Sequence, residues 1–437
     1  MARKVFISFL GGGTYKECVY YRNDFKSETV TFIQEATLKY LLKEEDWASG
    51  DAAYIMLTEG ARKSNWVDNG INLFTKQTKQ QVGLNSRLLQ MKLPFKFYDV
   101  GVPNGNDESE VMDIFIKLFE CVQEEDQLYL DITHGFRYLP MLMVVFGNYA
   151  KFLKNASVKS ITYGNYEDLG VEKPIMDFLP LSVMQDWTYG VGQFLVSGDA
   201  KVLLGLAQNE LRPILRESKG NNEEAKWLNI FLGKLNEVIE QRRYCRGVGI
   251  TESRTFSEMK SAAEKLSTTI IAPLNPLFDK IKTQMEDFPE NDVRNGYRAA
   301  RWCFEHGLDQ QAATILEEFV VSFFCEKYDI DLCYSVKNKK RELVNNAFTV
   351  VYNGIPEDGK DGWGKREVCS ENRDLFLNLI EDPLLTDKSL SQAFYILSQT
   401  VRNDINHAGM RDCPLSPQKL HEKIKKCLLT IENVLSL

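Results

Sequence analysis

The sequence predicts an α/β domain with a mostly parallel sheet, followed by a long all-α region. Over residues 1–180, apolar strand-like runs alternate with segments of helical periodicity, as in parallel strands joined by helices. Beyond residue 180 the strand-like runs stop and amphipathic helical patterns succeed one another. Because 437 residues exceed one ordinary domain, we expect three segments: 1–180, 181–290 and 291–437.

Five apolar runs predict the strands of the N-terminal sheet. The first, KVFISFL, is continuous, contains β-branched and aromatic residues and ends at three glycines, so it should be buried on both faces. A hairpin is expected around Asn23-Asp24, and Ser109 is a candidate cap for the helix that follows it. The five runs are residues 4–10, 52–61, 93–103, 127–132 and 157–167, and the helices between them are residues 32–45, 110–125 and 139–153.

Composition excludes several classes of protein. A formal net charge of −8 argues against a basic surface for duplex nucleic acid, although a small basic cleft remains compatible with it. Nine cysteines without a C-x-x-C pair or a His/Cys cluster indicate reduced thiols in the cytoplasm and no structural zinc. The apolar stretch 139–153 is broken by polar residues and is too short to span a membrane.

The first candidate binding loop is GGGTY, at the predicted carboxyl end of the first strand. Ligands of parallel sheets bind at this edge. Gly11, Gly12 and Gly13 allow a close backbone approach, so their N–H groups can cradle phosphates; a tight turn is the alternative. The loop does not fit G-x-G-x-x-G and no helix follows it directly, which counts against a dinucleotide-dependent enzyme.

The second candidate loop is DITHGFR, residues 131–137, at the end of the fourth strand. Thr133 and His134 offer a hydroxyl and an imidazole, and Gly135 permits an unusual turn. Arg137, in the first turn of the next helix, would form an anion site with the N–H groups there. A capping threonine beside a hydrogen-bonded core histidine is the alternative. The candidate ligand-binding residues are Leu10, Gly11, Gly12, Gly13, Thr14, Tyr15, Thr133, His134, Gly135, Arg137 and Tyr163.

These blocks together resemble a group of CRISPR-associated proteins with a CARF domain. The stretches FISFLGGGTYKE, LTEGARKSNW, VPNG, LDITHGFRYLPML and TYGNYE occur in the expected order over residues 3–180. The resemblance implies a Rossmann-like sheet that forms a homodimer and binds a cyclic oligoadenylate across the two-fold axis. A ring of four or six adenylates would then face residues 11–15 and 133–137 of both subunits.

Near the C-terminus, RNDINHAG places Arg402 and His407 on one predicted helix. The helix has an apolar stripe at 3.6-residue spacing: Leu390, Phe394, Leu397, Val401 and Ile405. Because the stripe faces the core, Arg402, Asn403 and His407 should face away from it. A polar helix end with no further role is the alternative, since two residues at this spacing often occur by chance.

Residues 291–437 resemble the HEPN ribonuclease domain that often follows a CARF domain in type III CRISPR effectors. The family signature is R-x4-6-H, usually with a polar residue after the arginine, which here are Arg402, Asn403 and His407. The resemblance implies metal-independent cleavage of single-stranded RNA by its own 2′-hydroxyl, at a composite site of a homodimer. Arg402 would stabilise the charge on the phosphate and His407 would transfer protons. Asn403 would orient the phosphate or the imidazole, and no cofactor would take part.

Two other interpretations follow from the same residues. In the first, the HEPN domain is only a dimerisation module, and the protein is a sensor or regulator. The CARF domain can also degrade its own activator through Thr133 or His134. Two basic stretches, 242–246 and 337–342, are interpreted as solvated faces, and His421 as a surface residue.

Overall fold

Strand β1 (Lys4–Leu10) lies inside the sheet and is buried on both faces, as its composition predicted. It pairs in parallel with β4 on one side and β6 on the other. Its side chains alternate between two hydrophobic layers, with Phe6 in one and Val5 and Ile7 in the other. A central parallel strand must be apolar on both sides because helices cover both faces of the sheet.

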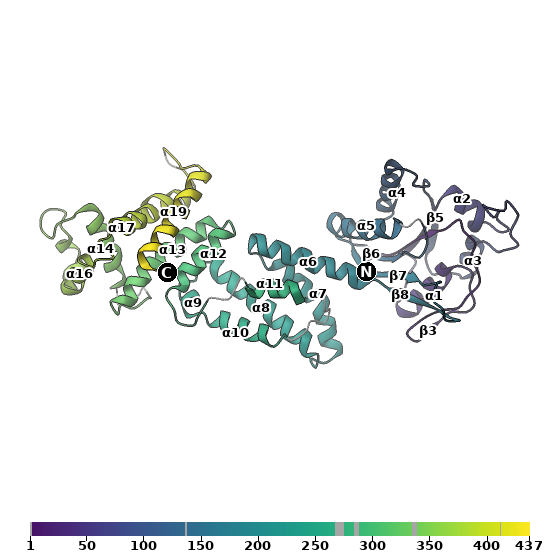
Figure 1. Cartoon of the computed structure of the whole chain (residues 1–437), viewed down its shortest axis with the longest axis horizontal. Helices are drawn as coiled ribbons and strands as arrows, with labels where there is room; N and C mark the ends of the chain where they lie inside the picture. Colours follow the sequence, from purple (N-terminus) through teal and green to yellow (C-terminus); the bar gives the residue numbers. More distant parts are fainter. Residues whose placement is uncertain (1, 136–137, 267–274, 284–287, 334–338, 411) are drawn as a thin grey trace. The chain divides into compact units, whose positions relative to one another are not determined.

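The computed structural model describes residues 2–135, 138–266, 275–283, 288–333, 339–410 and 412–437. The chain divides into two compact units, here called unit 1 (Met1–Gln185) and unit 2 (Asp186–Leu437) (Figure 1). Each unit is described by itself, and the predicted boundary at residue 290 stays a prediction. Among the residues described, no helix combines the length and the apolar character needed to cross a membrane.

Unit 1 is built on one eight-stranded sheet with the order β3-β2-β8-β7-β6-β1-β4-β5. The five strands from β7 to β5 are parallel neighbours, while β7–β8 and β2–β3 pair antiparallel. The predicted mostly parallel α/β fold is thus confirmed. The elements are β1, β2 (Tyr20–Arg22), β3 (Phe25–Lys26), α1 (Ile33–Glu44), β4 (Ala52–Leu57), α2 (Glu59–Ala61), η1 (Arg62–Trp66), α3 (Leu84–Gln90), β5 (Lys96–Gly101), α4 (Glu108–Glu120), β6 (Gln127–Asp131), α5 (Leu139–Lys154), β7 (Ser157–Gly164) and β8 (Lys173–Asp177).

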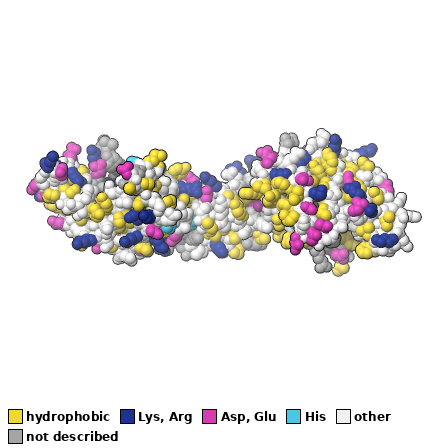
Figure 2. Space-filling model, turned by 90° about the horizontal axis from the view of Figure 1, so that it is seen from above, with side chains coloured by type: hydrophobic (Ala, Val, Ile, Leu, Met, Phe, Trp, Pro, Cys, Tyr) yellow, Lys and Arg dark blue, Asp and Glu magenta, His cyan; other side chains and the backbone are white. Residues whose placement is uncertain are grey.

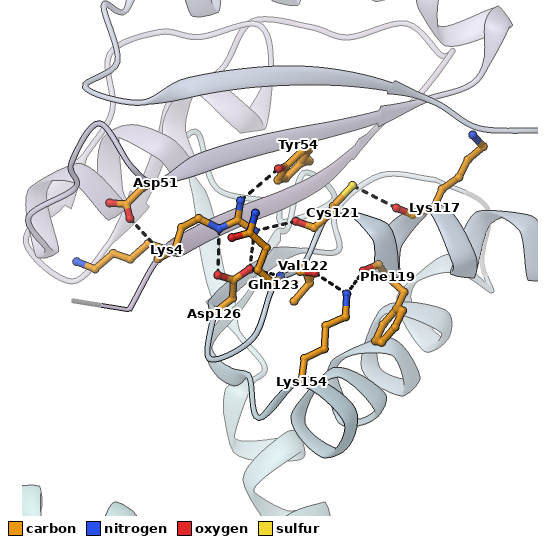
Figure 3. A network of polar contacts seen from close by, with 11 residues as sticks. Lys4, Asp51, Tyr54, Lys117, Phe119, Cys121, Val122, Gln123, Asp126 and Lys154 are labelled. Atoms are coloured by element: carbon orange, nitrogen blue, oxygen red, sulfur yellow. Dashed lines mark hydrogen bonds and ion pairs between the residues drawn. The ribbon is translucent and has the colours of Figure 1, made fainter.

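Helices α4 and α5 pack on one face of the sheet, and α1 and α3 pack on the other (Figure 1). A polar network ties the end of α4 to the sheet and to α5 (Figure 3). Arg3 forms a two-pronged ion pair with buried Asp126, from Nε to Oδ1 at 3.0 Å and from Nη2 to Oδ2 at 2.6 Å. Lys154 donates from Nζ to the main-chain oxygens of Phe119 and Val122.

Two local predictions in unit 1 have different outcomes. The hairpin is confirmed: β2 and β3 pair antiparallel, and Asn23 at φ 49° occupies the turn between them. The cap of α4 is Asp107 rather than Ser109, because the carboxylate of Asp107 accepts the N–H of Glu110 at 2.9 Å. An aspartate two residues upstream is the stronger cap, since it adds negative charge at the positive end of the helix.

The regular elements of unit 2 among its described residues are all helices, joined by loops (Figure 1). The predicted break at Gly307, whose φ is +70°, separates α12 from α13. Arg242 contradicts the interpretation of 242–246 as a solvated face: it is 2% exposed and lies between the rings of Phe288 and Trp302. The helices are α6 (Leu179–Ser197, which begins in unit 1), α7 (Lys201–Glu217), α8 (Glu223–Arg243), α9 (Gly247–Glu252), α10 (Arg254–Glu264), α11 (Asn275–Thr283), α12 (Asn295–Glu305), α13 (Asp309–Lys327), α14 (Arg341–Asn353), η3 (Trp363–Lys365), α15 (Glu367–Glu371), α16 (Arg373–Ile380), α17 (Lys388–Tyr395), η4 (Ile396–Arg402), α18 (Asn403–Asn406) and α19 (Pro417–Leu435).

Candidate functional site

A cavity of about 560 Å³ opens in unit 1 where the loops after β1, β6 and β7 meet. These loops converge because the carboxyl ends of neighbouring parallel strands share one edge of the sheet. The described residues that the sequence nominated for ligand binding all line this cavity: Leu10, Gly11, Gly12, Gly13, Thr14, Tyr15, Thr133, His134, Gly135 and Tyr163. Arg137, also nominated, lies outside the described residues.

The glycine loop is held by its carbonyl groups. The side-chain amide of Asn65 donates to the oxygens of Gly11 at 2.7 Å and Gly13 at 2.8 Å, and the hydroxyl of Ser64 donates to the oxygen of Gly12. Within the described part of the chain, the N–H groups of Gly12, Gly13 and Thr14 have no acceptor. A loop with its carbonyls tied back and its amides unused can bind an anion through the amides.

Two of the three glycines have close neighbours, since a Cβ on Gly11 would lie 3.0 Å from the hydroxyl oxygen of Tyr15. A Cβ on Gly12 would lie 2.8 Å from Leu73, whereas a Cβ on Gly13 would meet nothing within 4 Å. The N–H of Gly11 donates to the hydroxyl of Tyr15 at 2.8 Å. The loop is therefore a wall of the cavity that is held by side chains, and no backbone hydrogen bond of a tight turn closes it among the described residues.

Sequence reasoning missed the residues that support the glycine loop. Lys79 donates from Nζ to Asn65 Oδ1 at 2.6 Å and to Ser64 Oγ at 2.8 Å, and burial lowers the pKa of this lysine. Ser64 and Asn65, both 2% exposed, belong to the stretch LTEGARKSNW that carried the resemblance, but no role had been given to them. Lys79 had no signal in the sequence, since its contact depends on where a distant loop folds back.

In the second loop, Asp131 and Thr133 form a fixed polar centre. Asp131 is fully buried and accepts hydrogen bonds from Ser8 Oγ at 2.7 Å and from Thr133 Oγ1 at 2.5 Å. Burial raises the pKa of Asp131, although these hydrogen bonds oppose the rise. The Thr133 hydroxyl also accepts the N–H of Gly164 at 2.8 Å, which joins the ends of β6 and β7.

His134 packs edge-on against Tyr15, with 4.6 Å between the ring centres. Burial lowers the pKa of His134 to about 4, so the imidazole is neutral near pH 7. Its Nε2 is buried and has no hydrogen-bond partner among the described residues. A neutral ring with an unused nitrogen at a cavity wall can hydrogen-bond to a ligand. His134 therefore differs from the hydrogen-bonded core histidine of the alternative, since it is only partly buried and its Nε2 has no partner among the described residues.

Further cavity residues follow other strands at the same edge. Thr58 comes directly after β4 and Asn104 follows β5. Both could have been nominated by the rule that ligands bind beyond the carboxyl ends of parallel strands. The remaining residues that sequence reasoning missed are Phe9, Lys16, Tyr20, Thr31, Met56, Gly60, Leu73 and Leu139. Gly164, Tyr166 and Glu167 also line the cavity and belong to the loop TYGNYE after the fifth strand, from which the sequence suggests an aromatic wall.

In unit 2, Arg402 is held by two glutamates of α13. Its Nη1 lies 3.0 Å from Oε1 of Glu317 and 3.8 Å from Oε1 of Glu318. Glu317 is 7% exposed; burial raises its pKa, and the charge of Arg402 opposes the rise. Sequence reasoning missed both glutamates, because a pair of acidic residues inside an amphipathic helix carries no motif.

Asn403 and His407 lie near Arg402 in sequence without a side-chain contact to it among the described residues. The Asn403 amide donates to the oxygen of Gln399 at 3.2 Å, and His407, exposed, is the C-terminal cap of α18. The structure thus places the three residues on one helix end, but it does not assemble them into a hydrogen-bonded set within one chain.

The predicted helical wheel fails at its last turn. Residues Ile396–Arg402 form a π-helical segment, which holds more residues per turn than an α-helix. The apolar stripe is buried through Val401, but after the π turn Asp404, at 2% exposure, takes the inward position expected of Ile405. Arg402 is accordingly only half turned away from the core, which lets it reach Glu317.

Comparison with known proteins supports the assignment of unit 1. Residues 5–167 match the family model described as the CARF domain of CRISPR system endoribonuclease Csx1. The chain is also 25% identical over 256 residues to CRISPR-associated protein MJ1674 of Methanocaldococcus jannaschii, an alignment that covers 57% of this chain. The chain spans about a third, 36%, of that relative's length. These matches, with the sheet described above, support a CRISPR-associated protein whose first unit is similar to a CARF domain.

Proposed function

We propose that this protein is an endoribonuclease of CRISPR defence that acts in the cytoplasm and is activated by a cyclic oligoadenylate. The observation that carries the proposal is the cavity of about 560 Å³ in unit 1, around which all the described residues nominated for the ring converge. The match of this unit to the CARF domain of a CRISPR endoribonuclease supports the same ligand.

The cavity has suitable groups for both parts of an adenylate ring. Phosphates can accept hydrogen bonds from the unused N–H groups of Gly12, Gly13 and Thr14. Adenine bases can pack on the aromatic walls that Tyr15 and Tyr163 provide. A symmetric ring fits a homodimer, because a two-fold axis presents every loop twice.

In unit 2, Arg402 and His407 supply the chemistry of the proposed cleavage. The RNA 2′-hydroxyl oxygen bonds to the adjacent phosphorus while the bond from phosphorus to the 5′-oxygen breaks. This leaves a 2′,3′-cyclic phosphate and a 5′-hydroxyl. His407 transfers protons in this exchange, Arg402 stabilises the negative charge on the phosphate oxygens, and Asn403 orients the phosphate. The motifs of two subunits form one site, and no metal or cofactor takes part.

Ligand binding must favour the cutting state for activation to occur. A ring that bound the resting and the cutting-competent dimer equally would not shift the equilibrium between them. The ring must therefore bind the cutting-competent dimer more tightly. Residues 181–290, whose described elements are helices, are the coupling element in this proposal.

The test is cleavage of a fluorescent single-stranded RNA in EDTA with cyclic tri-, tetra- or hexa-adenylate. We expect one ring size to activate, and His407→Ala to lower kcat by about 10²–10⁴-fold. His421→Ala is the matched control, since His421 stacks on Phe304 at the surface of α19. The nuclease proposal would be refuted if the His407→Ala variant still cleaved the RNA, or if no ring induced cleavage by the wild type.

One observation favours a second candidate function, a sensor or regulator whose second unit only dimerises. Arg402 is already paired with Glu317, and the imidazole of His407 contacts neither Arg402 nor Asn403 in the described structure. Ring binding without RNA cleavage would support this candidate. Chromatography of the ring after incubation with His407→Ala would show whether Thr133 or His134 also degrades it.

A further inference from the structure

Helix α17 separates two surface features of unit 2, a groove against α19 and a stacked pair of tyrosines against α14 (Figure 1). The groove has a volume of about 250 Å³, and Arg402, Asn403 and His407 are not among the residues that line it. We call it the α17–α19 groove; its residues are Ser389, Gln392, Ala393, Ile396, Lys423, Lys426, Cys427 and Thr430.

The lysines of α19 carry positive charge that the chain itself does not pair. Lys423 and Lys426 line the groove, and Lys419, one turn before Lys423, lies in the same row. Within the described part of the chain, none of these three ammonium groups forms an ion pair or a side-chain hydrogen bond. Figure 2 shows Lys and Arg side chains on the visible face of unit 2. In a protein of net charge −8, a row of unpaired cations along a groove indicates an anionic ligand.

The acidic residues of α19 do not neutralise the groove. Glu432 pairs with Arg301 of α12 at 3.5 Å, and Glu422 lies outside the groove. Among the described residues, no carboxylate lines the groove, whereas Ser389 and Thr430 add hydroxyl groups that can donate to phosphate oxygens. A volume of about 250 Å³ suits a phosphate with its sugar rather than a folded protein segment.

On the other side of α17, Tyr395 stacks face to face on Tyr352 of α14, with 4.0 Å between the ring centres and 11° between the ring planes. A second pair, Phe348 and Phe394, stacks one turn earlier on α14 and is buried. Because the buried pair already joins α14 to α17, the outer pair is not needed for this packing. Tyr352 is 40% exposed, so one side of the outer stack is open to solvent. An exposed aromatic ring of this kind can stack on a nucleobase.

The groove and the tyrosine stack open on the same exposed side of α17. Gln392 is exposed, lines the groove and comes one turn before Tyr395. It therefore lies between the lysine row and the aromatic stack. A ligand that carries phosphates and an aromatic group could contact both features at once.

The π-helical segment brings the stack into line with His407. An α-helix makes a turn in about 3.6 residues, and the π-helical turn within Ile396–Arg402 holds about one residue more. Tyr395 and the exposed His407 are therefore about three full turns apart and on the same side of the helix. At about 1.5 Å per residue the separation is roughly 18 Å, which a few nucleotides of an extended strand can span.

We propose that the α17–α19 groove and the Tyr352–Tyr395 stack bind single-stranded RNA, with phosphates at Lys423 and Lys426 and a base on Tyr352. Proteins that bind single strands without sequence preference combine a positively charged groove with aromatic side chains in this way. An acidic peptide would use the lysines but not the exposed ring, and a duplex would offer no free base to it. That this strand is the substrate of cleavage rests on the proposed function; the binding site itself rests on the groove and the stack.

The first experiment measures how salt affects RNA binding. The full chain, with and without cyclic tetra- or hexa-adenylate, is titrated into a fluorescein-labelled single-stranded RNA of about 12 nucleotides whose 2′-O-methyl riboses block cleavage. Fluorescence anisotropy gives the association constant at several salt concentrations. Lys423→Gln should weaken binding and reduce the slope of log K against log salt by about 0.7, the contribution of one single-strand phosphate contact. Lys425→Gln removes the same charge outside the groove and should leave the slope unchanged.

The second experiment tests the aromatic stack with the same RNA. Tyr352→Leu should weaken binding at least about fivefold without changing the salt slope, because stacking releases no counterion. Tyr352→Phe keeps the ring and should bind like the wild type. In cleavage assays, Lys423→Gln and Tyr352→Leu should raise KM with kcat nearly unchanged, since both contacts lie away from the reacting phosphate. Circular dichroism melting shows whether each variant is folded; if Tyr352→Leu is not, the two lysine variants decide.

Three results would overturn the site: an equal change of slope in Lys425→Gln and Lys423→Gln, equal affinity of folded Tyr352→Leu and Tyr352→Phe, or binding of a blunt RNA duplex as tight as that of the single strand. A wild type that binds no RNA with or without a ring would overturn it as well. Binding through these residues by a protein that cleaves no RNA would instead refute the proposed function and leave the site standing. Cleavage whose KM none of these variants changes would refute the site and leave the nuclease standing.

Discussion

Replacing Asn65 with alanine should destabilise the glycine loop and reduce the affinity of the cavity for its ligand. The Asn65 amide donates to the oxygens of Gly11 and Gly13, and its own oxygen accepts from Lys79. A neutral hydrogen bond contributes about 1 kcal/mol and one to a charged group about 1.5–3 kcal/mol, so we expect Asn65→Ala to lower the free energy of unfolding by about 3.5–5 kcal/mol. At about 2–4 °C per kcal/mol for a domain of this size, the melting temperature of unit 1 should fall by about 7–20 °C.

Scanning calorimetry of the full chain measures the change, because the transitions of the two units can be compared in one scan. Isothermal titration with cyclic tetra- and hexa-adenylate then tests whether the loop shapes the binding site. Asn72→Ala is the matched control: its side chain accepts from the N–H groups of Phe74 and Thr75 and does not touch the glycine loop. We expect it to leave ring affinity unchanged.

The reasoning would be refuted if the transition of unit 1 in Asn65→Ala stayed within about 1 °C of the wild type, since the three hydrogen bonds would then contribute almost nothing. It would also fail if Asn72→Ala reduced ring affinity as strongly as Asn65→Ala. If stability fell but no ring bound even to the wild type, the structural argument would stand and the proposed ligand would not.

Three further predictions concern single side chains. The pKa of His134 is about 4 in the folded protein and near 6.5 in the unfolded chain, so stability falls as the pH drops from 6.5 to 4. Urea unfolding should show a loss of about 2 kcal/mol between pH 7 and pH 5, and His134→Gln should remove this loss. Gly135→Ala, at φ +126°, should lower stability by about 1–3 kcal/mol, while Gly13→Ala changes it little; equal melting temperatures would contradict this. If Arg402 binds RNA phosphate as proposed, Glu317 competes for the guanidinium, so Glu317→Gln should lower KM about 10-fold in cleavage assays with kcat nearly unchanged; an unchanged KM would contradict the competition.

The sheet and its binding edge could be predicted because they depend on local patterns. A continuous apolar run such as residues 4–10 can only be a strand or a short helix segment, and the glycines that bound it favour the strand. Once the strands are parallel, their carboxyl ends lie at one edge, so the loops at 11–15 and 131–135 could be placed there; they meet because β1 and β6 are neighbours.

The supporting contacts could not be predicted, because they join segments with no pattern that relates them. Asn65 and Lys79 reach the glycine loop only after η1 and the loop behind it fold against β1. In unit 2 the helical wheel assumed 3.6 residues per turn, and the π-helical segment Ile396–Arg402 breaks that assumption. The prediction is wrong by one residue at the last turn. Because of this shift, the Arg402 side chain pairs with Glu317.

The pairing of Arg402 with Glu317 also bears on how unit 2 is completed. The Oε2 atom of Glu317 is buried and has no hydrogen-bond donor among the described residues. A buried carboxylate oxygen without a donor is costly, and replacing such an ion pair with apolar residues often stabilises a helical bundle. The buried oxygen of Glu317, close to Arg402 and the end of η4, thus leaves one acceptor that a donor from outside one chain could satisfy, which is compatible with the proposed composite dimer site.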